Sequence, residues 1–159
     1  MNHLFSIGLF IHIIGITCIA GGIIGGLVLE NHIWKHVHQS PEKVSVLAPL
    51  MSKYPAIIQA GTLLMLLSGF LMLKALSWAV VGQWWFIIKM ALVVALVLNG
   101  MLIARPNGNK LRVLAGQLVN GQSVETELKT VRKKMMIFHI SEMTMLIVVY
   151  LLAVFQTLI

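Results

Sequence analysis

The sequence predicts an all-α integral membrane protein, in which a single domain over residues 1–159 forms an antiparallel bundle of four transmembrane helices. Hydrophobic residues make up 58% of the chain and charged residues only 11%, whereas a soluble domain has about 45–50% and about 25%. Most charged residues gather in two segments, 30–53 and 105–134, and long apolar runs separate them. The single cysteine, Cys18, excludes an internal disulfide.

Four apolar segments are long enough for helices that cross the hydrocarbon core of a bilayer, which takes about 20 residues. They cover residues 4–29, 55–80, 84–104 and 135–158. Continuous apolar runs without period-two alternation favour helices over the strands of a barrel. The first segment has no basic residues before it and no cleavage signature, which predicts a retained helix.

The connections between these segments differ in length. Residues 81–83 alone join the second and third helices, which predicts a tight hairpin with tryptophans 78, 84 and 85 at a membrane interface. The segment Arg105-Pro106-Asn107-Gly108 predicts the end of the third helix. We expect a short surface helix or loop over residues 110–134, and an amphipathic lead-in to the second helix over residues 42–54.

The positive charges predict an orientation. Lysine and arginine concentrate in the first and third connections, and the positive-inside rule places such connections in the cytoplasm, so both termini lie on the outer face. The same rule accounts for the net charge of +7 without nucleic acid as a partner. We therefore predict a protein of a bacterial-type cytoplasmic (inner) membrane, with lipid as its partner and other membrane subunits or a second copy as further candidates.

Ionisable side chains inside the predicted helices are candidate site residues, because they are costly in a bilayer. An outer level holds His12, Lys89 and, nearer the surface, Lys74. Glycine recurs with His12 along one face of the first helix, at positions 8, 15, 22 and 26. Gly8 and Gly15 would leave open surface beside the imidazole, as a porphyrin needs when a histidine nitrogen binds its iron.

Other interpretations of the outer level stay open. Glycine stripes commonly let spanning helices pack closely, and Lys74 is long enough to reach the interface. In the cofactor interpretation His12 is the haem-iron ligand, and Lys89 or Lys74 neutralises a propionate.

An inner level holds His139 and Glu142 on the fourth helix, Asn99 on the third, and Gln59 with Thr62 on the second. His139 and Glu142 are three residues apart and share a helix face. Such a pair could relay protons, bind a metal or clamp two helices together. After the first helix, His32 and His36 fall at a metal-ligand spacing, with His38 close by. A solvated histidine-rich helix end is the alternative interpretation of these three.

The helices also carry short motifs in a recognisable order. His12 is followed by Ala20-Gly21, Pro55 opens the second helix, Gly69 lies within it, and Trp85 precedes Lys89 by four residues. This pattern resembles the four-helix membrane fold of the HemJ-type protoporphyrinogen oxidases and CopD-like proteins. The resemblance implies a b-type haem, with functional roles at His12 and Lys89.

The sequence departs from the HemJ pattern at Thr17-Cys18, where a tryptophan is expected, and at Ile87, where a histidine is expected. These departures predict a distant relative with a similar fold and a different task. The leading hypothesis is a haem-binding membrane protein with a redox or tetrapyrrole-related role, and any enzymatic activity depends on that haem. The alternatives are a non-enzymatic accessory or assembly subunit, and a metal-handling or transport protein that uses His32, His36, His139 and Glu142.

Overall fold

The computed structural model describes residues 3–37 and 39–155, and this part of the chain is helical throughout, with turns between the helices and no strand. The elements in order are α1 (His3–His36), α2 (Pro41–Leu47), a 3-10 helix (Ala48–Ser52), α3 (Tyr54–Ala75), α4 (Trp84–Asn99), a π-helical turn (Gly100–Ala104), α5 (Arg105–Val119) and α6 (Glu125–Phe155). They form four long apolar stretches, His3–His36, Glu42–Ala75, Trp84–Val119 and Glu125–Phe155, each long and apolar enough to cross a membrane. The predicted all-helical class with four such helices is confirmed.

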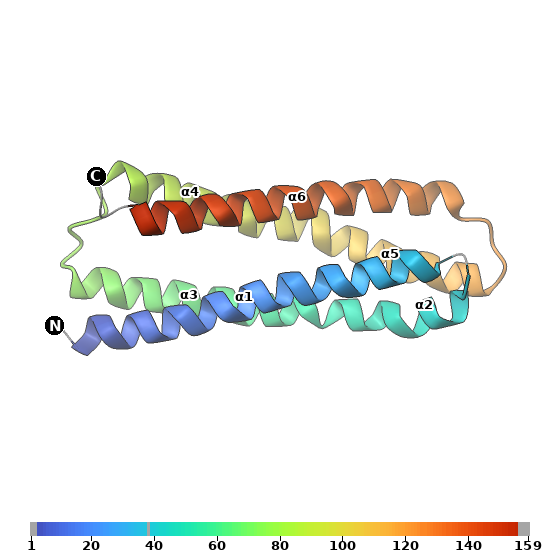
Figure 1. Cartoon of the computed structure of the whole chain (residues 1–159), viewed down its shortest axis with the longest axis horizontal. Coiled ribbons are helices and arrows are strands. Elements are labelled where there is room, and N and C mark those ends of the chain that lie inside the picture. Colours follow the sequence, from blue (N-terminus) through green and yellow to red (C-terminus); the bar gives the residue numbers. More distant parts are fainter. Residues whose placement is uncertain (1–2, 38, 156–159) are drawn as a thin grey trace.

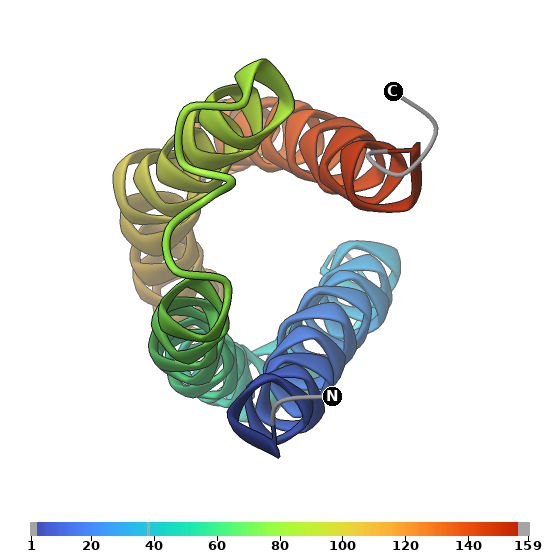
Figure 2. The same cartoon turned by 90° about the vertical axis from the view of Figure 1, so that its left-hand side faces the viewer.

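The four stretches lie lengthwise beside one another, and the start of α1 and the end of α6 lie at the same end of the molecule (Figure 1). Within this arrangement α1 packs extensively on α3, and α4 packs on α6. Viewed from the end that carries the termini, the α1–α3 pair and the α4–α6 pair stand apart as two layers (Figure 2). Contacts between the described residues of these two pairs are sparse, so the pairs are held together mainly at the other end.

Glycine brings the backbones of α1 and α3 into direct contact. A Cβ atom at Gly15 would lie 2.9 Å from the carbonyl oxygen of Gly61, and one at Gly61 would lie 2.7 Å from the carbonyl oxygen of Gly15. Further along the same face, Gly8 meets Met72 and Gly22 meets Ile58. Small residues of this kind allow helices to approach closely enough for van der Waals packing to hold them.

The end of the molecule away from the termini has an apolar core, here called the distal core. It joins α1, α2, the 3-10 helix, α5 and α6, and consists of Ile33, Val37, Val44, Ala48, Leu111, Leu114, Ala115, Val124, Leu128, Val131 and Met135. The spacing of Leu111, Leu114 and Ala115, and of Leu128, Val131 and Met135, places each set on one helix face. The basic side chains between them face outward.

The third predicted helix does not end at residue 104, as the sequence had led us to expect, but continues to Val119. Pro106 lies in the first turn of α5, where a missing N–H is tolerated. The π-helical turn just before it widens the helix, and the side-chain amide of Asn107 donates to the carbonyl of Ile103 at 2.6 Å. Together these features let the chain pass the proline without leaving the helix.

The other predicted boundaries also need correction. α1 runs to His36 rather than residue 29, and α6 begins at Glu125 rather than residue 135, because both ends pack on the distal core. Residues 110–134 are therefore mostly the ends of two long helices and not a surface loop. The last predicted residues of the fourth helix, 156–158, lie outside the described part.

The second and third predicted helices are joined by a longer connection than expected. α3 ends at Ala75 rather than residue 80, since Ser77 and Trp78 have positive φ angles of 50° and 62°. Residues 76–82 form turns. Trp78 packs edge-on against Phe70, with ring centroids 5.5 Å apart, and this contact holds the turn against α3.

Candidate functional site

His12 is half-buried on α1, and its ring is held by α3. Its Nδ1 lies 2.9 Å from Oγ of Ser68, a fully buried residue, and the Ser68 hydroxyl donates to the carbonyl of Met65 at 3.0 Å. With its hydrogen on the Met65 carbonyl, the Ser68 hydroxyl accepts from His12. This arrangement favours the Nδ1–H tautomer, in which the lone pair is on Nε2. Histidines that bind metals are commonly oriented by such a hydrogen bond on the opposite nitrogen.

The structure places the two candidate lysines differently. Lys89 is half-buried on α4 and lies within electrostatic range of His12. Lys74 is exposed in the last turn of α3. Of the two, Lys89 therefore belongs to the surroundings of His12, whereas Lys74 lies at the end of its helix.

The glycines around His12 do not provide the open surface that the cofactor interpretation asked of them. Gly8 and Gly15 are buried against α3, and added Cβ atoms there would lie 2.8 Å and 2.9 Å from the side chains of Met72 and Met65. The space beside the stripe is therefore filled by a neighbouring helix of the same chain. The same contact takes up the surface that an accessory subunit would have used to pack against a partner.

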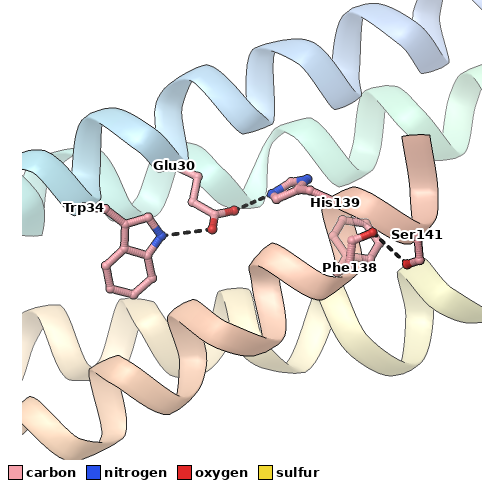
Figure 3. Close-up of polar contacts among 5 residues, drawn as sticks. All are labelled: Glu30, Trp34, Phe138, His139 and Ser141. Atoms are coloured by element: carbon pink, nitrogen blue, oxygen red, sulfur yellow. Dashed lines mark hydrogen bonds and ion pairs between the residues drawn. The ribbon is translucent and has the colours of Figure 1, made fainter. Parts of the chain in front are cut away.

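The inner level contains a buried polar group that joins α1 to α6. Nε2 of His139 lies 2.6 Å from Oε2 of Glu30, and the indole N–H of Trp34 donates to Oε1 of Glu30 at 2.9 Å (Figure 3). The Glu30 and His139 side chains are only 6% and 13% exposed. Both oxygens of Glu30 thus have a donor, while Nδ1 of His139 is buried without a hydrogen-bond partner.

Glu142 lies one turn from His139 on α6 and is also buried. The amide of Asn99 on α4 donates to Oε2 of Glu142 at 2.7 Å and to Oγ of Ser141 at 3.0 Å. Three helices therefore contribute to one polar cluster, here called the inner cluster: Glu30, Trp34, Asn99, His139 and Glu142. His139 and Glu142 share a face of α6, and each has its hydrogen-bond partner on another helix, Glu30 for His139 and Asn99 for Glu142.

The remaining histidine candidates lie apart from this cluster. His32 and His36 stack at the end of α1 with ring centroids 4.4 Å apart, and His36 Nδ1 lies 2.9 Å from the His32 carbonyl oxygen. His38 lies outside the described residues. Within residues 3–37 and 39–155, no group of three or more histidine, cysteine or acidic side chains could hold a metal ion.

Sequence reasoning missed Glu30, Trp34 and Ser68. Glu30 had been assigned to a charged connection, but Ile33 and Val37 continue the apolar face beyond it, and Trp34 follows at the i+4 spacing of helix neighbours. A serine within the apolar run of α3 was likewise a signal of a polar contact. From these signals the first helix could have been predicted to continue beyond residue 29, and the three residues could have been included in the candidate sites.

The comparisons with known proteins leave the family open. No family model matches the chain, and no curated protein and no solved structure matches it significantly. The fold and the two polar sites define the chain as a helical protein with four membrane-length apolar helices and buried ionisable groups.

Proposed function

We propose that the four helices form an antiparallel bundle across a bacterial-type cytoplasmic membrane, with both termini on the outer face. Large apolar side chains are exposed along every long helix, among them Phe10, Leu63, Leu102 and Val154. Lipid is the environment in which such surfaces are stable. The lysines and arginines of α5 and the first turns of α6 are mostly exposed at the end away from the termini, which supports a cytoplasmic position for that end.

Cysteine labelling tests this orientation. In a Cys18→Ser background, single cysteines at Gly82 and Glu127 report the two ends of the bundle. We expect a membrane-impermeant maleimide added to intact cells to label Gly82→Cys and to spare Glu127→Cys until the cells are lysed. The reverse pattern would overturn the orientation, and labelling of both sites in intact cells would overturn the membrane-spanning arrangement.

We propose that the bundle binds a haem, of the b type, for a redox or tetrapyrrole-related task, with His12 as the iron ligand. The observation that carries this proposal is the hydrogen bond from His12 Nδ1 to Ser68, since it fixes the ring and leaves Nε2 free to bind a metal. The half-buried Lys89 is a suitable partner for a propionate. The sparse contact between the two helix pairs, and not the glycine stripe, would have to provide the room.

A bound haem would supply one-electron chemistry, and the residues around His12 would set its position. Ser68 orients the imidazole and prevents Nδ1 from competing for the metal. The apolar side chains of α1, α3 and α4 would exclude water from the ring. The resemblance to HemJ-type and CopD-like proteins agrees with this proposal through His12 and Lys89, and the family relationship itself is part of what we propose.

Visible absorption tests the haem proposal. The full chain, expressed with haem supplementation and purified in detergent, is compared in oxidised and dithionite-reduced states with His12→Ala and with His32→Ala, an exposed control. We expect a Soret band and reduced α and β bands that His12→Ala loses and His32→Ala keeps. A featureless wild-type spectrum, or a band that survives in His12→Ala, would refute the proposal.

A further inference from the structure

The inner cluster contains more acidic groups than basic ones, so its net charge depends on how many protons it binds. Glu30 and Glu142 are both buried, and with both ionised and His139 neutral the cluster carries two negative charges within long apolar helices. Burying unpaired charges in this way is costly. The cluster becomes neutral only when this state gains two protons, so it must be able to bind protons.

The hydrogen bonds indicate where one of these protons belongs. Glu30 accepts from Trp34 at one oxygen and faces His139 Nε2 at 2.6 Å with the other. A separation this short is characteristic of a charge-assisted hydrogen bond between an imidazolium and a carboxylate. Glu30 therefore stabilises a positive charge on His139, with one proton on Nε2 and a second on Nδ1.

Nδ1 is the position at which His139 can gain and lose its proton. It is buried and has no partner, which is unfavourable whether the atom carries a hydrogen or a lone pair. Glu142 lies one turn further along α6, with one oxygen held by Asn99. Phe138 is beside the ring, with centroids 5.0 Å apart, and offers no hydrogen-bonding group.

The other helices add no competing charge at hydrogen-bond distance among the contacts described. α4 contributes the neutral amide of Asn99. The guanidinium of Arg132 lies over the Trp34 ring, 5.9 Å from the ring centroid. The ionisable groups near His139 are thus Glu30 from α1, which is drawn with it in Figure 3, and Glu142 from its own helix, with Arg132 near the Trp34 ring.

We propose that Glu30, His139 and Glu142 form a proton-transfer site in the bundle interior. In the transfer, the O–H bond of a protonated Glu142 breaks and an N–H bond forms at His139 Nδ1, which leaves a Glu142 carboxylate and an imidazolium. The imidazolium is held against the carboxylate of Glu30 until the N–H bond at Nδ1 breaks and the O–H bond of Glu142 forms again. No electrons move, and haem is not required, so the inference stands apart from the function proposed for His12.

Nitrogen NMR of the full chain in lipid nanodiscs, labelled with ¹⁵N-histidine and prepared without haem, tests the proposal. His139→Gln identifies the His139 signals by their absence. We expect the wild-type Nδ1 signal to change from protonated to unprotonated as the pH of the sample is raised. A His139 that keeps one fixed protonation state throughout overturns the proposal, and this result needs no variant that might misfold.

Two isosteric variants separate proton transfer from a merely structural clamp. In Glu30→Gln we expect the doubly protonated fraction of His139 at neutral pH to fall about tenfold, since an opposite charge at this distance is removed. Glu127→Gln, exposed on the same helix as His139, should leave that fraction unchanged. Equal spectra for wild type and Glu30→Gln would show that Glu30 only packs against the ring, and would overturn the assignment.

Discussion

Replacing Gly15 by alanine should separate α1 from α3. The added Cβ would lie 2.9 Å from the carbonyl oxygen of Gly61 and 2.9 Å from Cγ of Met65. A methionine side chain can rotate away, but a backbone carbonyl within a helix cannot. The helices must therefore move apart along the contact, and the packing on both sides of it is weakened.

The size of the effect follows from comparison with glycines that face open space. Overpacking of a close contact costs about 1–3 kcal/mol, whereas alanine gains about 0.8–1.0 kcal/mol over glycine in a helix interior. Gly69 has nothing within 4 Å of its Cβ position, so Gly69→Ala receives the helix gain alone. The difference between Gly15→Ala and Gly69→Ala removes this common gain and should be about 1–3 kcal/mol.

Equilibrium unfolding in mixed micelles, followed by far-ultraviolet circular dichroism, measures this difference. Gly61→Ala should behave like Gly15→Ala, because its Cβ would lie 2.7 Å from the Gly15 carbonyl. Gly22→Ala should be milder, since it meets the side chain of Ile58 at 2.6 Å. Equal stability of Gly15→Ala and Gly69→Ala would refute the packing role of the stripe. If Gly15→Ala instead lost a haem absorption band while its stability was unchanged, the glycine stripe would have to provide space for a cofactor, as in the cofactor interpretation.

Two further substitutions test other contacts by the same unfolding measurement. Asn99→Ala should lower the unfolding free energy by about 1–3 kcal/mol, because the buried carboxyl group of Glu142 loses its donor. The control Asn109→Ala, at an exposed position on α5, should change it by less than about 0.5 kcal/mol. Similar values for the two variants would refute the role of the Asn99 amide. Gly121→Ala should destabilise the α5–α6 turn by about 1 kcal/mol, since Gly121 has a φ of +75°. Gly116→Ala, in open space on α5, should be neutral or stabilising, and a turn that tolerated alanine equally well would contradict this reasoning.

Much of the fold was predictable from composition, because apolar runs of membrane length report helices directly. The boundaries were not, and the reason differs from place to place. Pro106 is a helix breaker in most contexts, and its tolerance here depends on a π-helical turn that no local sequence rule anticipates. The charged residues of the adjoining ends of α5 and α6 led to the prediction of a surface segment. The helical spacing of the apolar residues there indicates long helices instead: Leu111, Leu114, Leu128 and Val131.

The candidate site was predictable in its residues but less so in its partners. His12 and His139 were visible as ionisable groups in apolar helices. Their hydrogen-bond partners, Ser68 and Glu30, come from positions 56 and 109 residues away, and only the packing of the helices brings them together. For the glycine stripe the sequence supported two interpretations, and the structure shows α3 in the space beside it.

The length of the helices has a consequence for how the protein is built. The four stretches contain between 31 and 36 residues, or about 46–54 Å of helix at about 1.5 Å per residue, whereas the hydrocarbon core is about 30 Å thick. In the proposed orientation the excess projects into the cytoplasm around the distal core. That part would be stabilised by exclusion of water from leucine and valine, as in a soluble bundle, while the remainder would rely on close packing in lipid. In this proposed arrangement one chain folds in two solvents, and urea should loosen the projecting part at concentrations that leave the lipid-facing part intact.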